Sequence, residues 1–219
     1  MTLKIPSHVR FIAIEGVIGA GKTTLARHLT EMTQQKLILE TFQENPFLEK
    51  FYRNNKQWAF QAQMWFLLSR YRQLHNEFQH ADLFYQTIIS DYTFDKDRIF
   101  ASLNLNEDEM NIYDQVASAL KKEIIKPDYI VYLQASVDTL THRIKKRGRE
   151  MEKDIDPRYL KNLIDLYDHH FYHYTDCPVL IINTDPIDFV KNERNLMDLL
   201  QKISDVPTGT SYYNPASFR

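Results

Sequence analysis

Short apolar runs rich in isoleucine, valine and leucine alternate along the chain with longer segments whose apolar positions recur at helical spacing. This alternation is typical of a parallel sheet wrapped by helices, because strands buried on both faces read as continuous apolar runs. The pattern predicts the α/β class, with five strands: FIAIE (11–15), KLILE (36–40), TIISD (87–91), YIVYL (129–133) and VLIIN (179–183). Helices are expected at residues 22–34, 56–80, 106–123, 136–147, 157–174 and 187–203.

Length and composition favour one cytoplasmic domain spanning residues 1–219. Lys and Arg total 27 against 29 Asp and Glu, so no bulk positive charge suggests a nucleic-acid partner or an acidic membrane surface. No stretch approaches the roughly 20 apolar residues of a membrane helix. Cys177 is the only cysteine, which excludes an intrachain disulfide and suits a reducing compartment. The tail, residues 205–219, has turn residues and no period, and the sequence predicts no role for it.

A phosphate-binding loop follows the first predicted strand. Its glycines allow successive backbone N–H groups to point at phosphate oxygens, and the following helix presents its positive N-terminal end to the same anion. Lys22 would neutralise the β- and γ-phosphates, and the Thr23 hydroxyl would ligate Mg²⁺. A glycine-rich turn without a ligand is the alternative, but the strand–loop–helix context favours binding of ATP or GTP. The predicted loop, residues 16–24, consists of Gly16, Val17, Ile18, Gly19, Ala20, Gly21, Lys22, Thr23 and Thr24.

Two carboxylates end predicted strands. Glu40 follows KLIL and Asp91 follows TIIS, and ligands of an open parallel sheet bind beyond the carboxyl ends of its strands. A hydroxyl acceptor loses its proton during phosphoryl transfer, so Glu40 is our candidate general base. Asp91 is our candidate for holding Mg²⁺ through water. Either residue alone would more simply be a polar strand terminus, but the phosphate loop favours the catalytic interpretation.

One strongly apolar helix carries polar residues on a single face. Gln63 and Arg70 lie seven residues apart, almost two helical turns, among large aromatic residues. An amide and a guanidinium so placed can read the hydrogen-bonding edge of a planar base. A solvated stripe on an amphipathic helix explains the spacing equally well.

On these residues the chain resembles the deoxynucleoside kinase family, which includes deoxycytidine, deoxyguanosine and bacterial deoxyadenosine kinases. The likeness extends from about residue 10 to residue 203. It implies an α/β P-loop NTPase-type fold, with a five-stranded parallel sheet and a mobile arginine-rich lid near residues 143–153. It further implies a homodimer that uses Mg²⁺ and ATP to phosphorylate the 5′-hydroxyl of a deoxynucleoside.

The resemblance also assigns individual residues. Glu40, within ILETFQENPFLEKFY, occupies the place of the family's base, although Thr41 stands where proline is usual. Tyr52 and Glu152 match the residues that bind the sugar 3′-hydroxyl, and Gln63 and Arg70 match the pair that reads the base. Asp97 matches the acidic partner of that arginine in members that take purines or cytosine. In RIKKRGRE, three arginines resemble those that the lid closes over the phosphates: Arg143, Arg147 and Arg149. Without the resemblance, this basic run would read as a solvated helix face.

One departure from the family pattern concerns the end of the third strand. Relatives commonly carry an acid followed by arginine there, whereas this chain has Asp91 and Tyr92. A phenol supplies no permanent positive charge, so transition-state stabilisation is expected from Lys22, Mg²⁺ and arginines elsewhere. Arg98 and Arg147 are the candidates.

Two alternatives to a deoxynucleoside kinase stay open at this point. A nucleoside monophosphate kinase shares the loop and lid, but its phosphorylated acceptor would require an arginine near the strand ends. A non-catalytic regulatory module would bind ATP without turnover. Among acceptors, the Arg70–Asp97 pair favours deoxyadenosine or deoxyguanosine modestly over deoxycytidine, and makes thymidine the poorest.

Overall fold

The computed structural model describes residues 3–79 and 87–215. Within these residues, six strands form one parallel sheet in the order β2-β3-β1-β4-β5-β6. The α/β class with a parallel sheet is confirmed, and all five predicted strands are present, although β2 and β3 are only three residues long. The strands are β1 (Phe11–Gly16), β2 (Lys36–Ile38), β3 (Ile88–Ser90), β4 (Tyr129–Gln134), β5 (Val179–Asn183) and β6 (Thr210–Tyr213).

The sixth strand corrects the predicted count of five, and it lies in the tail for which the sequence predicted no structure. β6 pairs with β5 in parallel, with Thr210 opposite Val179 and Tyr213 opposite Ile182. The Tyr213 hydroxyl also donates a hydrogen bond to Asp198. Threonine and tyrosine favour strands, but four residues are too few for a period to be recognised. Residues 216–219 of the predicted tail lie outside the described residues.

The predicted helices are present with shifted ends, and residue 80, the last of the predicted 56–80 helix, lies outside the described residues. The helix predicted at 187–203 begins instead at Glu193, because the Asn192 side chain caps it by accepting from the Asn195 N–H. Two helices were not predicted, α2 and α4. The helices are α1 (Lys22–Thr33), α2 (Leu48–Arg53), α3 (Asn55–Gln79), α4 (Lys96–Asn104), α5 (Glu107–Lys121), α6 (Val137–Arg147), α7 (Pro157–Tyr172) and α8 (Glu193–Ser204), with 3₁₀ turns η1 (Phe42–Glu44) and η2 (Glu150–Glu152).

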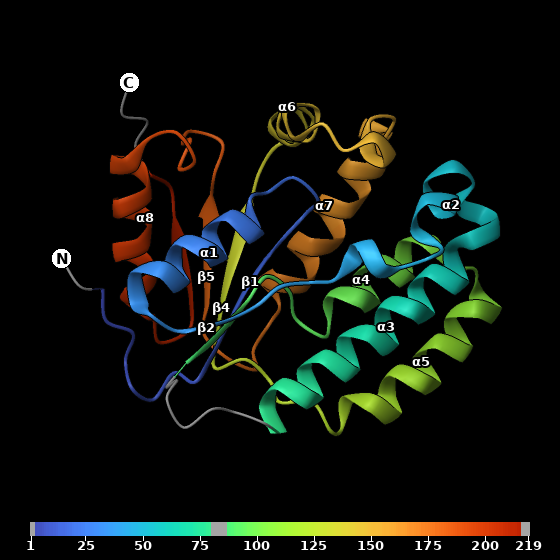
Figure 1. Ribbon diagram of the computed structural model, residues 1–219, viewed down its shortest axis with the longest axis horizontal. Helices are drawn as coiled ribbons and strands as arrows, with labels where there is room; N and C mark the ends of the chain where they lie inside the picture. Colours follow the sequence, from blue (N-terminus) through green and yellow to red (C-terminus); the bar gives the residue numbers. More distant parts are fainter. Residues whose placement is uncertain (1–2, 80–86, 216–219) are drawn as a thin grey trace.

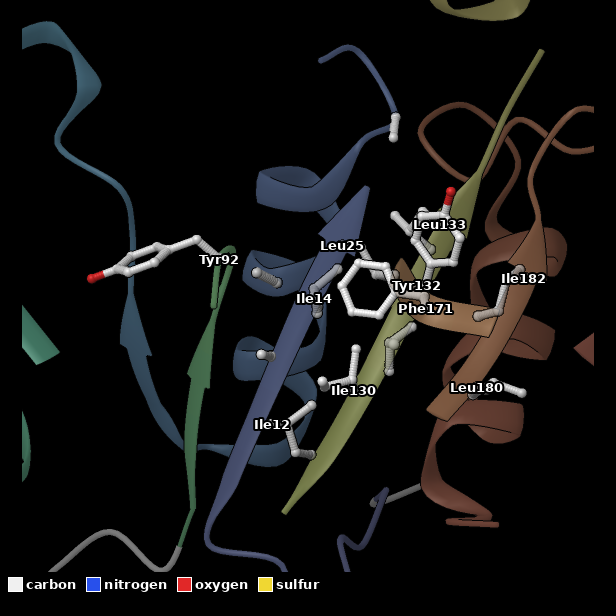
Figure 2. Close-up of a cluster of buried hydrophobic side chains, with 14 of the residues drawn as sticks. Ile12, Ile14, Leu25, Tyr92, Ile130, Tyr132, Leu133, Phe171, Leu180 and Ile182 are labelled. Atoms are coloured by element: carbon white, nitrogen blue, oxygen red, sulfur yellow. The ribbon is translucent and has the colours of Figure 1, made fainter. Parts of the chain in front are cut away.

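Figure 1 shows helices on both sides of the sheet, with α3, α4, α5 and α7 gathered on one side and α1 and α8 on the other. Every residue of β1 is buried, and five of the six residues of β4 are buried. Figure 2 shows their side chains meeting those of β5 and α7 in one apolar cluster, where the Tyr132 and Phe171 rings stack with centroids 4.8 Å apart. This core fixes the carboxyl ends of the strands, from which the loops of the candidate site emerge.

Candidate active site

The predicted phosphate loop connects β1 to α1. Gly21, immediately before α1, has a φ of 103°, and a Cβ placed there would lie 2.6 Å from the Phe189 ring, so only glycine fits. Lys22 donates from Nζ to the backbone oxygens of Gly16 at 2.7 Å and Val17 at 3.1 Å. Burial, assisted by the charge of Lys96, lowers the pKa of Lys22 to about 8. The loop lysine is therefore held by neutral carbonyl groups and is not paired with a carboxylate.

Below the loop, Thr23 and Asp91 lie in direct contact. The Thr23 hydroxyl donates to Asp91 Oδ2 at 2.5 Å, and the backbone N–H of Glu40 donates to Asp91 Oδ1 at 2.9 Å. Asp91 follows β3 and Glu40 follows β2, and these strands are neighbours in the sheet. The structure thus brings together the two predicted metal residues and the predicted base.

Glu40 is held between two cations. Its Oε1 accepts from Arg70 Nε at 2.8 Å, and its Oε2 accepts from Lys96 Nζ at 2.6 Å. Burial is the largest influence on the pKa of Glu40 and raises it, but Arg70 and Lys96 together outweigh burial and hold this pKa well below its usual range. Glu40 is therefore a carboxylate held in place by both cations.

Arg70 joins Glu40 to a second acid. Its Nη1 donates to Asp97, whose side chain is fully buried. Burial raises the pKa of Asp97 to about 6, and the Arg70 charge opposes this rise. Asp97 does not line the acceptor cavity, so the structure places it behind Arg70 and not at the cavity wall.

Four predicted substrate residues, Gln63 and Arg70 for the base and Tyr52 and Glu152 for the sugar, surround one cavity, here called the acceptor pocket, which has about 850 Å³ of space including its open mouth. Gln63 is 3% exposed, and its Oε1 accepts no hydrogen bond within the described part of the chain. A buried amide oxygen without a partner is costly unless a ligand satisfies it. The lining includes Lys22, Thr23, Glu40, Phe42, Tyr52, Gln63, Phe66, Arg70, Asp91, Lys96, Phe100, Arg147, Arg149, Glu152 and Tyr159.

Two of the predicted lid arginines lie against the acceptor pocket. Arg149 Nη1 donates to Glu152 Oε1 at 3.1 Å, and Arg147 also pairs with Glu152. The Arg149 guanidinium stacks over the Phe42 ring, 4.1 Å from its centroid. Glu152, on η2, is therefore paired with two cations beside Tyr52, whose pKa is raised by burial and by the Glu152 charge.

Arg143, the third predicted lid arginine, has a different position. Its guanidinium donates to Ala20 O at 3.2 Å, Thr184 Oγ1 at 2.9 Å, Thr184 O at 2.8 Å and Ile187 O at 3.3 Å. It thereby ties the phosphate loop to the segment after β5. That segment, residues 185–190, lines a second cavity with the phosphate loop and α6, here called the donor cleft.

Arg98 is not brought to the site, which corrects its prediction as a catalytic arginine. Its side chain is 61% exposed and bonds to Asp114 at 3.0 and 3.2 Å. Arg98 lies on α4 one residue beyond buried Asp97, so the helix directs it outward. Tyr92 lines neither cavity: its hydroxyl donates to Gln73 Oε1 at 2.7 Å, and Figure 2 shows its ring pointing away from the central cluster.

Sequence reasoning missed three residues that shape the site. Lys96 bonds to Glu40, and Thr93 bonds to the fully buried carboxylate of Glu15. Lys96 stands five residues after the strand-terminal acid Asp91, and this spacing was a signal that the sequence offered. An acid directly before the phosphate loop, in an otherwise apolar strand, was a signal for Glu15. Residues 185–190 were missed because the predicted helix was begun too early.

Residues 12–206 of this chain match the family model described as "Deoxynucleoside kinase". Deoxyguanosine kinase of Bacillus subtilis is 39% identical over 200 residues, covering 90% of this chain and 97% of that protein. Deoxyadenosine kinase of Dictyostelium discoideum is 32% identical over 213 residues, covering 94% of this chain and 84% of that protein.

Solved structures are similar over nearly the whole chain. Deoxyadenosine kinase from M. mycoides with bound dATP superposes with a TM-score of 0.76 at 28% identity, covering 88% of this chain and 98% of that one. The same enzyme with dCMP and a flexible dCDP superposes with a TM-score of 0.74 at 27% identity, covering 90% and 100%. Within the described residues, no helix is long and apolar enough to span a membrane.

Proposed function

This chain belongs to the deoxynucleoside kinase family, and we propose that it transfers the γ-phosphoryl group of ATP to the 5′-hydroxyl of deoxyguanosine or deoxyadenosine in nucleotide salvage. One observation carries the proposal. The phosphate-loop residues Lys22 and Thr23 and the strand-terminal carboxylate Glu40 line the same pocket, whose wall also presents the unpaired amide oxygen of Gln63. A donor phosphate and a planar base can therefore be held at one cavity.

The donor side suits a nucleotide phosphate chain with Mg²⁺. Lys22 exchanges its carbonyl partners for the β- and γ-phosphates, and residues 16–24 supply backbone N–H groups. Thr23 and Asp91 offer a hydroxyl and a carboxylate, the oxygen donors that Mg²⁺ prefers, while it keeps most of its waters and phosphate ligands. No cluster of three His, Cys, Asp or Glu suited to a metal occurs among the described residues. The bound metal supplies charge neutralisation for the phosphates.

On the acceptor side, Glu40 is the base. Its carboxylate lies beside the phosphate loop, and it accepts the proton of the 5′-hydroxyl as that oxygen attacks phosphorus. Arg70 orients the carboxylate, since it bonds Glu40 Oε1 from the floor of the pocket.

We assign the sugar to Tyr52 and Glu152, which lie together at the pocket wall. The 3′-hydroxyl competes with Arg147 and Arg149 for the Glu152 carboxylate, so sugar binding releases cations toward the phosphates. In this proposal residues 143–153 act as the lid, in which Arg143 anchors the phosphate loop to residues 184–187.

We assign the base to Gln63 and Arg70. Gln63 offers one acceptor and one donor, which match adenine, cytosine or guanine according to the orientation of the amide. The Arg70 guanidinium, with Asp97 behind it, favours a purine ring nitrogen. The printed names of the relatives, deoxyguanosine and deoxyadenosine kinases, support a purine.

A nucleoside monophosphate kinase is the less favoured alternative. An acceptor that already carries a phosphate would need a cation beside its binding site. The arginines and Lys96 of the acceptor pocket are paired with Glu40, Asp97 and Glu152, and Lys22 serves the donor phosphates in this proposal. Tyr92, at the relevant strand end, is uncharged and donates its hydroxyl to Gln73.

The test is a comparison of kcat/KM for deoxyguanosine, deoxyadenosine, deoxycytidine and thymidine, with ATP and Mg²⁺. We expect a purine deoxynucleoside to be best and thymidine at least about tenfold worse, because thymine lacks the purine ring nitrogen that would accept from Arg70, and an unmet buried polar group costs about 1–3 kcal/mol. A thymidine value equal to the best purine value contradicts the base assignment. Phosphorylation of deoxynucleoside monophosphates alone would favour the alternative.

We further propose a cytoplasmic homodimer, as the resemblance implies. Molar mass from light scattering tests the dimer, since the chain alone weighs 26.1 kDa. A mass of one chain at assay concentrations contradicts it.

A further inference from the structure

Lys96 is a buried cation that no part of the family comparison explains. Its side chain is 6% exposed, it is the first residue of α4, and its Nζ donates to Glu40 Oε2 at 2.6 Å. It also lines the acceptor pocket together with Gly19, Lys22 and Thr23 of the phosphate loop. Its ammonium group therefore bonds to the candidate base within the same pocket that the phosphate loop lines.

The position of Lys96 is fixed from below by a buried carboxylate. Glu15 Oε1 accepts from the backbone N–H of Thr93 at 2.6 Å and from its hydroxyl at 2.8 Å. Thr93 Oγ1 in turn accepts from the backbone N–H of Lys96 at 3.2 Å. Because Glu15 is the last residue of β1 before the phosphate loop begins at Gly16, this chain of bonds ties the start of α4 to the loop.

Lys96 and Lys22 lie close enough to repel each other. After burial, the charge of Lys96 is the next largest influence lowering the pKa of Lys22, and both lysines lower the pKa of Glu15 while burial raises it. Holding two ammonium groups beside one cavity costs free energy in the empty protein. A polyanionic ligand between them relieves that cost.

Tyr92 and Arg98, two other polar residues near Lys96 in the sequence, bring no positive charge to the acceptor pocket. Tyr92 is neutral and faces Gln73, and Arg98 bonds to Asp114 at the surface. Phosphoryl transfer spreads negative charge over the oxygens in transit, and fixed cations stabilise it.

Resting on the proposed function, we propose that Lys96 is a catalytic residue whose ammonium group donates to an oxygen of the phosphoryl group in transit. In the empty site Lys96 pairs with Glu40, and in the loaded site it bridges Glu40 and the phosphoryl oxygen. The bond between O5′ and the γ-phosphorus forms as the bond from that phosphorus to the β–γ bridging oxygen breaks. The electron pair of the broken bond leaves with ADP, the 5′ proton passes to Glu40, and Lys96 keeps its proton.

A purely structural Lys96 would act only by pairing with Glu40. A double-mutant cycle of Lys96→Met and Glu40→Gln distinguishes this structural role from a direct role in catalysis. The double variant removes one positive and one negative charge together, so it avoids an uncompensated buried charge. A direct role predicts a further loss on changing Lys96 when Glu40 is already glutamine, whereas a structural role predicts none.

The experiment measures kcat, KM and thermal unfolding for the wild type, the cycle variants and Lys96→Arg, using the deoxynucleoside that the wild type phosphorylates fastest. Equilibrium dialysis gives the deoxynucleoside Kd. Lys121→Met is the matched control, because that lysine pairs with Asp95 at the surface, 46% exposed. We expect Lys96→Met to lower kcat about 100-fold or more with the Kd changed less than about fivefold. Lys96→Arg should recover at least about tenfold of that loss, and the double variant should fall at least about tenfold below Glu40→Gln.

Three results would overturn the inference: a kcat for Lys96→Met within about fivefold of wild type, no difference between the double variant and Glu40→Gln, or no recovery by arginine. A wild type that phosphorylates no deoxynucleoside would contradict the proposed function itself. Because the acceptor is chosen by measurement, a wrong base assignment leaves the Lys96 test intact.

Discussion

The acceptor pocket and the donor cleft hold their charges in opposite ways. In the acceptor pocket, Arg70 is bound by the carboxylates of Glu40 and Asp97 before any ligand arrives. At the donor cleft, Lys22 and Arg143 are bound by backbone carbonyls and a threonine hydroxyl, all of them neutral. A neutral partner gives way to phosphate with little loss, whereas a carboxylate does not. The acceptor side is thus organised for fixed geometry, and the donor side for exchange.

The largest effect expected is on catalysis at the junction of the two regions. Glu40→Gln keeps the shape of the pocket but removes the proton acceptor, so kcat should fall by about 10²–10⁴-fold while deoxynucleoside Kd changes little. Steady-state kinetics and equilibrium dialysis measure the two quantities. Glu44→Gln is the control, because Glu44 is exposed on η1. Turnover within a few-fold of wild type would show that Glu40 is not the base.

The second effect tests whether the acceptor pocket is held by its charge pairs. Arg70→Met leaves Glu40 and Asp97 facing each other with one cation fewer, so the free energy of unfolding should fall by about 3–5 kcal/mol. Urea denaturation measures it. Arg98→Met removes an arginine from an exposed pair on the same side of the molecule and should cost less than about 1 kcal/mol. An equal loss of unfolding free energy in the two variants would show that the charge pairs do not hold the acceptor pocket.

The third effect belongs to the donor side alone. Gly21→Ala forces a side chain into a φ of 103° and against Phe189, a strain of about 1–3 kcal/mol that opens the phosphate loop. ATP KM should rise about tenfold or more, with deoxynucleoside Kd unchanged. Gly209→Ala, also at positive φ but with open space around it, is the control. A weakened deoxynucleoside Kd in Gly21→Ala would mean that the two regions are not independent.

The smallest effect concerns the sugar. A 2′,3′-dideoxynucleoside leaves Tyr52 and Glu152 without the 3′-hydroxyl, so kcat/KM should fall by about tenfold, the value of an unpaired polar group. Tyr52→Phe should reduce the difference in kcat/KM between the deoxynucleoside and the 2′,3′-dideoxynucleoside. Equal efficiencies for both sugars in the wild type would refute the assignment.

The sequence predicts the donor side better than the acceptor side. The phosphate loop is one contiguous segment, so its pattern fixes both its residues and their shape. Glu40 and Asp91 were placed correctly because strand ends follow from apolar runs. The pairing of Lys96 with Glu40 joins residues 56 positions apart on different elements, and no local pattern predicts it.

The orientation of α4 explains why Arg98 lies away from the site. Neighbouring helical residues point about 100° apart, and the face of α4 that buries Lys96 and Asp97 leaves Arg98 at the surface. The sequence shows both side chains but not which face of α4 packs inward. The burial of Asp97 and Lys96 settles that orientation in the structure.

The short β6 strand has a consequence for behaviour in solution. A sheet ending at β5 would present the unpaired backbone of a strand whose Val179, Leu180, Ile181 and Ile182 are all buried, which is a template for pairing with other chains. β6 replaces that edge with four residues that alternate exposed and half-buried side chains. A chain shortened before Thr210 would therefore aggregate through β5, even though its kinase residues all lie upstream.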